Sequence, residues 1–162
     1  MKIVKRVFVG IIVLLIVASI GFVAWTRIAR HPAQSIATAL ITPSTVTTQG
    51  WYVFKSGQAT DLGFIFYPGG LVDPAAYAPI AKGLADQGIT WISVPMPLDL
   101  AIFGINSADA VIAAYPDIKH WIIGGHSLGG SMAAEYAASH SMKVQGLVLL
   151  AAYPAASTNL AD

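Results

Sequence analysis

Four short apolar segments, separated by stretches with helical patterning, constrain the fold of this chain most strongly. Each lacks charged residues and is rich in aliphatic or aromatic side chains, as expected of strands that are buried on both faces of a sheet. The expected strands are Leu62–Tyr67, Ile89–Val94, Trp121–Ile123 and Val144–Ala152, preceded by a shorter one at Trp51–Phe54. The expected helices are Pro74–Gln87, Ser107–Tyr115 with Ser107 as its N-cap, and Leu128–Ser139. Strands that alternate with helices predict an α/β fold, in which a mainly parallel sheet carries helices on both faces.

The N-terminal part of the chain has a different character. Val7–Trp25 contains no charged residue, and a helix of this length would span about 28 Å, close to the thickness of the hydrocarbon core of a bilayer. Lys2, Lys5 and Arg6 precede the run, which favours a cytoplasmic N-terminus. We therefore expect a retained single-pass anchor in the cell membrane, with the domain outside the cytoplasm. The alternative is a signal peptide cleaved after Ser19, which would make the domain a secreted protein.

These patterns divide the chain into three regions. Residues 1–30 form the expected membrane anchor. Residues 31–48 are rich in alanine, serine, threonine and proline, and we expect them to form a linker. Residues 49–162 form the expected α/β domain.

The composition excludes several function classes. The net charge is only +1, and 10% of the residues are charged, so no basic surface is available to neutralise several phosphates of a nucleic acid. Cysteine is absent, which removes disulfides, thiolate metal sites and cysteine nucleophiles together. The four histidines do not have the spacing of a metal site, and no glycine motif for a phosphate or a dinucleotide occurs. We expect neither a metal nor a cofactor.

The segment Gly125-His126-Ser127-Leu128-Gly129 is a G-x-S-x-G motif between an expected strand and an expected helix. A nucleophile elbow has this context, because a sharp turn from strand to helix presents a serine hydroxyl above the sheet. Small residues must flank such a serine, since larger side chains would collide with the neighbouring strand and helix. The alternative is an ordinary glycine-rich turn in which Ser127 caps the helix.

A second glycine turn, Pro68-Gly69-Gly70, follows the expected strand Leu62–Tyr67. Acyl transfer needs two backbone N–H groups aimed at the developing oxyanion, one from the residue after the nucleophile and one from the loop after an earlier strand. Glycines would let the backbone of this loop approach a substrate closely. A plain turn is the alternative.

The motifs resemble those of the α/β-hydrolase superfamily, and more narrowly the bacterial membrane-anchored α/β-hydrolases akin to the dienelactone-hydrolase and small-esterase group. The resemblance rests on the segments Phe64–Gly70, Val72–Pro74 with Tyr77, Met96-Pro97 with Leu100-Ala101, Trp121–Ser131 and Gly146–Pro154. It implies that Ser127 is the catalytic nucleophile and that Gly70 and Leu128 supply the N–H groups of the oxyanion hole. It also implies a small-molecule substrate with a carboxylic ester, a lactone or a related acyl bond.

The chain departs from the family at the partners of the nucleophile. The triad order in this fold is serine, then acid, then histidine, yet only His140, Glu135 and Asp162 follow Ser127 as candidates. His140 lies thirteen residues beyond the serine, and that length of helix measures about 20 Å. We therefore expect a fragment that holds a nucleophile without the triad acid and histidine.

The remaining polar residues leave two functions open. Asp73 is expected to cap the helix that begins near Pro74, whereas Asp99 and Asn106 either line a substrate pocket or are simply solvated. The first hypothesis is a serine hydrolase that uses Ser127. The alternative is a non-catalytic, membrane-anchored binding module with an α/β-hydrolase-like fold.

Overall fold

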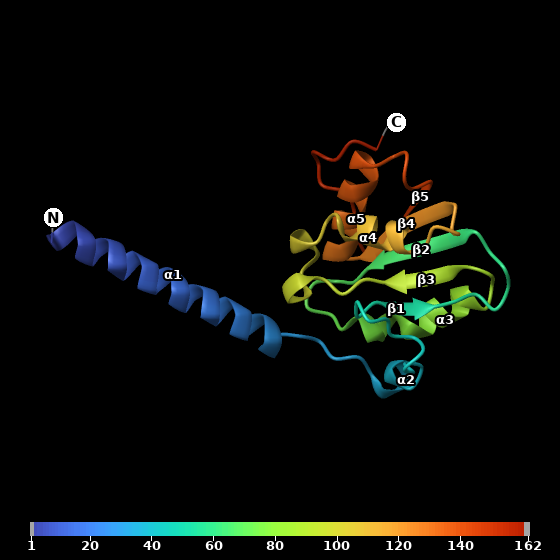
Figure 1. Cartoon of the computed structure of the whole chain (residues 1–162), viewed down its shortest axis with the longest axis horizontal. Coiled ribbons are helices and arrows are strands. Elements are labelled where there is room, and N and C mark those ends of the chain that lie inside the picture. The colour runs from blue at the N-terminus through green and yellow to red at the C-terminus, as the bar shows by residue number, and fades with distance from the viewer. Residues whose placement is uncertain (1, 161–162) are drawn as a thin grey trace. The chain divides into compact units, whose positions relative to one another are not determined.

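The computed structural model describes residues 2–160, and the chain divides between Arg30 and His31 into two units (Figure 1). The first unit is the helix α1, Lys2–Ile28, which contains no proline and exposes its apolar side chains. Its length and hydropathy are sufficient to cross a membrane, and a signal sequence would have the same properties.

The second unit is built on a five-stranded sheet with the strand order β1-β3-β2-β4-β5. The strands are β1 Tyr52–Phe54, β2 Leu62–Tyr67, β3 Thr90–Ser93, β4 His120–His126 and β5 Gly146–Leu150. Only β1 runs antiparallel to its neighbour; β3, β2, β4 and β5 are parallel. Because β2 and β4 pair from Leu62 with His120 to Tyr67 with Gly125, they end level with each other. Their two following turns therefore lie side by side.

Helices cover both faces of the sheet, which confirms the predicted α/β class (Figure 1). On one face, Phe64, Phe66 and Trp91 pack against α3 (Ala78–Ala85), which follows a short 3-10 helix at Pro74–Tyr77. On the other face, the alternate residues Ile65 and Tyr67 pack against α4 (Ser107–Ala114) and α5 (Leu128–Ser139). Both faces of β2 are thus buried, as its uninterrupted apolar sequence predicts.

Two capping predictions have different outcomes. The side chain of Asp73 accepts a hydrogen bond of 2.9 Å from the N–H of Ala75, so the predicted cap is confirmed. Ser107, expected as the cap of α4, instead lies inside the helix, and Asn106 at the cap position makes no capping bond through its side chain. The reason is tertiary: the hydroxyl of Tyr67 accepts from the free N–H of Ala108 at 2.9 Å.

Residues 31–48, which have the composition of a linker, lie within the second unit. They include the short helix α2 (Ser35–Thr38), in which Ala37 is buried. Leu40 and Ile41 pack against the cluster that Phe64, Phe66 and Trp91 form with α3. These small and apolar side chains therefore cover part of the sheet, although the polar residues around them suggest a solvated segment.

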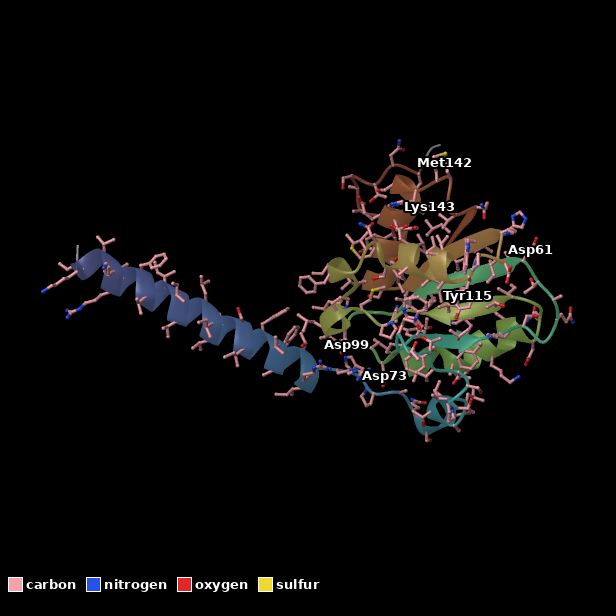
Figure 2. All side chains as sticks on the ribbon, viewed as in Figure 1. Asp61, Asp73, Asp99, Tyr115, Met142 and Lys143 are labelled. Carbon is pink, nitrogen blue, oxygen red and sulfur yellow. The ribbon has the colours of Figure 1, made fainter. Side chains whose placement is uncertain are left out.

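Two 3-10 helices, Pro97–Asp99 and Ala101–Phe103, follow β3 at the same end of the sheet as the turns after β2 and β4. Figure 2 shows Asp73 and Asp99 close together at this end of the domain and Asp61, which precedes β2, at the other end. In a parallel sheet the carboxyl ends of the strands meet at one edge, where ligands of open α/β sheets bind.

Candidate active site

Ser127 occupies the sharp turn between β4 and α5. Its φ of 50° and ψ of −123° lie outside the regions that most side chains adopt, and such strain costs about 1–3 kcal/mol. Two backbone bonds hold the turn: the N–H of Ser127 donates to the carbonyl of Leu150 (3.0 Å), and its own carbonyl accepts from the N–H of Ser131 (3.1 Å). The side chain remains exposed at the edge of the sheet. This is the geometry of a nucleophile elbow.

Glycine is required on both sides of the serine because backbone atoms fill the space of a side chain. A Cβ at Gly125 would lie 2.5 Å from the carbonyl carbon of Gly129 and 2.6 Å from the carbonyl oxygen of Tyr67. A Cβ at Gly129 would collide with the carbonyl oxygens of Tyr67 and Pro68. The elbow is therefore pressed directly against the end of β2.

The turn after β2 brings Gly70 beside Leu128, the residue that follows Ser127. A Cβ at Gly70 would lie 3.2 Å from Cδ2 and 3.6 Å from Cβ of Leu128. The two backbone segments expected to donate to an oxyanion are thus neighbours, although they are far apart in the sequence.

The Gly69–Asp73 loop is held by backbone bonds from distant segments. The N–H of Leu71, which has a φ of 59°, donates to the carbonyl of Asp99 at 2.8 Å. His31 bridges the other side of the loop: its N–H donates to the carbonyl of Leu71 (2.6 Å), and its carbonyl accepts from the N–H of Asp73 (3.0 Å). Asp99, half-buried, therefore supports the loop through its backbone, whereas Asn106 is exposed.

A tyrosine and a histidine complete the surroundings of the loop. The hydroxyl of Tyr77 accepts from the N–H of Gly69 at 3.0 Å and lies 3.0 Å from Nδ1 of His126. Burial raises the pKa of Tyr77, so its phenol stays protonated at neutral pH. Sequence reasoning assigned no role to either side chain, because 49 positions separate them and no local pattern links them.

The other histidine and acidic candidates lie elsewhere. His140 follows the last residue of α5. Its ring stacks on that of Tyr136, with the ring centroids 4.2 Å apart, and its Nδ1 lies 3.1 Å from the carbonyl oxygen of Tyr136. Glu135 accepts from the hydroxyl of Thr158 at 2.7 Å. Asp162 lies outside the described residues. Among residues 2–160, no side chain forms a hydrogen bond with the hydroxyl of Ser127, and no group of three or more acidic, histidine or cysteine residues could hold a metal ion.

The elbow within a mainly parallel, doubly covered sheet defines a hydrolase-like α/β protein. Residues 63–162 match the sequence profile of the Alpha/beta hydrolase family. This match covers more than half of the chain, and the chain therefore belongs to the Alpha/beta hydrolase family.

Solved structures share this fold. A probable hydrolytic enzyme from Pseudomonas aeruginosa is 21% identical, with a TM-score of 0.54 over 64% of this chain and 38% of the other. MenH from S. aureus is 19% identical, with a TM-score of 0.52 over 61% of this chain and 41% of the other. A structure from work on the metagenome-derived lipolytic enzymes LipS and LipT is 16% identical, with a TM-score of 0.51 over 67% of this chain and 46% of the other. The chain thus spans less than half the length of these proteins. No curated protein matches the chain.

Proposed function

We propose that this chain provides the nucleophile and the oxyanion hole of a serine hydrolase that acts on a carboxylic ester, a lactone or a related acyl bond. The observation that carries the proposal is the position of Ser127 in a strained elbow, with Gly70 packed against Leu128 beside it. Membership of the Alpha/beta hydrolase family supports the same reaction class.

In the proposed reaction, Ser127 Oγ forms a bond to the carbonyl carbon of the substrate while a general base takes its proton. The carbonyl oxygen becomes an oxyanion and accepts hydrogen bonds from the N–H groups of Gly70 and Leu128. Such preorganised donors typically contribute about 10²–10³ to kcat each. The acid and histidine of the triad belong, in this proposal, to the part of the family fold that the chain does not span.

An active-site-directed fluorophosphonate tests the nucleophile. In the product of the complete reading frame, peptide mass spectrometry should find the probe on Ser127, and Ser127→Ala should abolish labelling. Ser131→Ala is the matched control, because Ser131 lies in α5, which begins directly after Ser127, and donates its hydroxyl to the carbonyl of Tyr153; this variant should label normally. Equal labelling of the wild type and Ser127→Ala would overturn the assignment.

A second candidate is a non-catalytic binding module, favoured by the lack of a hydrogen-bond partner for the Ser127 hydroxyl among residues 2–160. Hydrolysis of a short-chain nitrophenyl ester by the complete gene product separates the two. Turnover that disappears in Ser127→Ala supports the enzyme. Binding of the ester without turnover supports the module.

We also propose that α1 is a retained anchor and that the domain lies outside the cytoplasm. The charge-free apolar helix supports this placement. Protease treatment of intact cells should release the domain from the membrane fraction. A soluble domain in the medium, with a new N-terminus at Ile20, would show instead that the helix is a cleaved signal peptide.

A further inference from the structure

One phenol connects the two turns of the candidate site. Tyr77 Oη accepts the N–H of Gly69, the residue before Gly70, and lies 3.0 Å from Nδ1 of His126, the residue before Ser127. A Cβ at Gly69 would lie 2.5 Å from Nδ1 of His126 and 3.2 Å from Tyr77 Oη. Only glycine at position 69 lets the phenol and the imidazole approach the backbone this closely.

The hydroxyl of Tyr77 makes two hydrogen bonds at once. It accepts from the N–H of Gly69, and it shares a second hydrogen bond with Nδ1 of His126. The phenol has one proton of its own, which it can donate to an unprotonated ring nitrogen. The raised pKa of Tyr77 agrees with a phenol that remains a donor.

The same bonds fix the direction of the neighbouring N–H of Gly70. The carbonyl of Gly69 and the N–H of Gly70 belong to one planar trans peptide, in which they point in opposite directions. That carbonyl accepts from the N–H of Val72 at 3.1 Å, while the N–H of Gly69 is held by Tyr77 at 3.0 Å. Two consecutive glycines would otherwise rotate freely, because neither has a Cβ to restrict φ and ψ.

We infer that Tyr77 is a positioning residue, whose hydroxyl, oriented by His126, aims the N–H of Gly70 at the oxyanion formed by attack of Ser127. This inference rests on the proposed hydrolase function. Tyr77 does not touch the reacting atoms; it acts through the Gly69–Gly70 peptide. The bound substrate carries no oxyanion; the charge develops in the transition state and is complete in the tetrahedral intermediate, so misdirection of the donor lowers kcat and leaves KM nearly unchanged.

The test compares Tyr77→Phe with the wild type in the complete gene product, using a short-chain nitrophenyl ester. We expect kcat to fall about 10- to 100-fold, part of the effect of losing one oxyanion donor, and KM to change by less than about threefold. Tyr115→Phe is the matched control, since it also removes a phenol hydroxyl. The ring of Tyr115 packs beside Trp51, with the two ring centroids 6.5 Å apart. An unchanged kcat in Tyr77→Phe, or an equal loss in Tyr115→Phe, overturns the inference.

A pair of variants at His126 tests the other end of the connection, also in case Tyr77→Phe does not fold. His126→Asn keeps an acceptor near the position of Nδ1, whereas His126→Ala removes it. We expect Asn to restore at least part of the kcat that Ala loses; equal values for the two variants count against the inference.

Hydrogen exchange separates this inference from the proposed function. In the 162-residue chain, Tyr77→Phe should speed exchange of the Gly69 amide at least about tenfold, because that amide loses its acceptor. Unchanged exchange overturns the positioning role even if the enzyme is active. If Ser127→Ala retains full turnover, the proposed function fails, and the exchange result still decides whether Tyr77 holds the loop.

Discussion

The two turns that meet at the site are held in opposite ways. The elbow after β4 is fixed by close packing: the glycines around Ser127 leave no space between its backbone and the end of β2. The loop after β2 is fixed by hydrogen bonds to three residues outside it, namely Tyr77, Asp99 and His31. The comparison indicates that a side chain added at the elbow will damage the fold, whereas a change at the loop will mainly misdirect its N–H groups.

The largest effect is expected at the elbow. Gly129→Ala places a Cβ against the carbonyl oxygens of Tyr67 and Pro68, which belong to the backbone and cannot turn aside. We expect a loss of at least about 3 kcal/mol in the free energy of unfolding, measured by urea denaturation. Gly83→Ala is the control, because, apart from the neighbouring backbone of α3 itself, no atom lies within 4 Å of its Cβ position. It should stabilise the helix by up to about 1 kcal/mol; similar stability of the two variants would contradict the packing argument.

The loop should respond in its activity more than in its stability. The nearest atoms to a Cβ at Gly70 belong to the side chains of Leu128, at 3.2 Å, and Leu100, at 3.5 Å, and the end of the Leu128 side chain can shift. We expect Gly70→Ala to change the free energy of unfolding by less than about 1 kcal/mol, while kcat of the complete gene product falls about tenfold or more. Urea denaturation and ester hydrolysis measure the two effects. A variant that unfolds readily would show that this turn is as tightly packed as the elbow.

The same contrast explains what the sequence could predict. The limits of β2 and α5 agree with their predicted limits, because an uninterrupted apolar strand and a run of small residues after a G-x-S-x-G motif are local patterns. The position of Ser127 in a strand-to-helix turn was predictable for the same reason. The resemblance to the α/β-hydrolases implied that Gly70 and Leu128 act together, but their adjacency depends on the pairing of β2 with β4, which no local pattern specifies.

The supports that Asp99 and His31 give to the loop could not be predicted, because they join segments that are distant in the sequence. His31 lies in a stretch with the composition of a linker, yet its backbone pairs with both sides of Val72. Ser107 has the right residue type for a helix cap, but the hydroxyl of Tyr67 reaches the same turn of α4 from the sheet. In both places a tertiary hydrogen bond replaces the local preference.

A smaller effect is expected at His31, where the backbone and not the imidazole supports the loop. His31→Pro removes the N–H that donates to the carbonyl of Leu71. We expect a loss of about 1 kcal/mol in the free energy of unfolding and faster hydrogen exchange in the Gly69–Asp73 loop. His31→Ala keeps the N–H and should behave like the wild type in both measurements. An equal loss in the two variants would instead assign the support to the side chain.

The smallest effect is expected at a contact remote from both turns, between α4 and α5. The carboxylate of Asp109 accepts hydrogen bonds of 2.7 Å from Lys143 and from Tyr136, and these bonds lower the pKa of Asp109. A carboxyl group with a lowered pKa in the folded state stabilises the protein above its unfolded pKa of about 3.9. This contribution is lost as the pH falls through the lower, folded value. Because the side chain of Asp109 is 42% exposed, solvent screens the pair with Lys143.

Asp109→Asn should therefore reduce the free energy of unfolding by less than about 1 kcal/mol at pH 7. The difference from the wild type should shrink on acidification, since protonated aspartic acid and asparagine are both neutral. Urea denaturation at pH 7 and pH 3 measures both effects, and Asp86→Asn is the control, because Asp86, directly after α3, pairs with Lys82 on the exposed side of that helix. The turnover of the complete gene product should not change in either variant. A fall in kcat in Asp109→Asn would show that the contact between α4 and α5 positions the elbow, and that packing around the glycines is not sufficient to hold Ser127 in place.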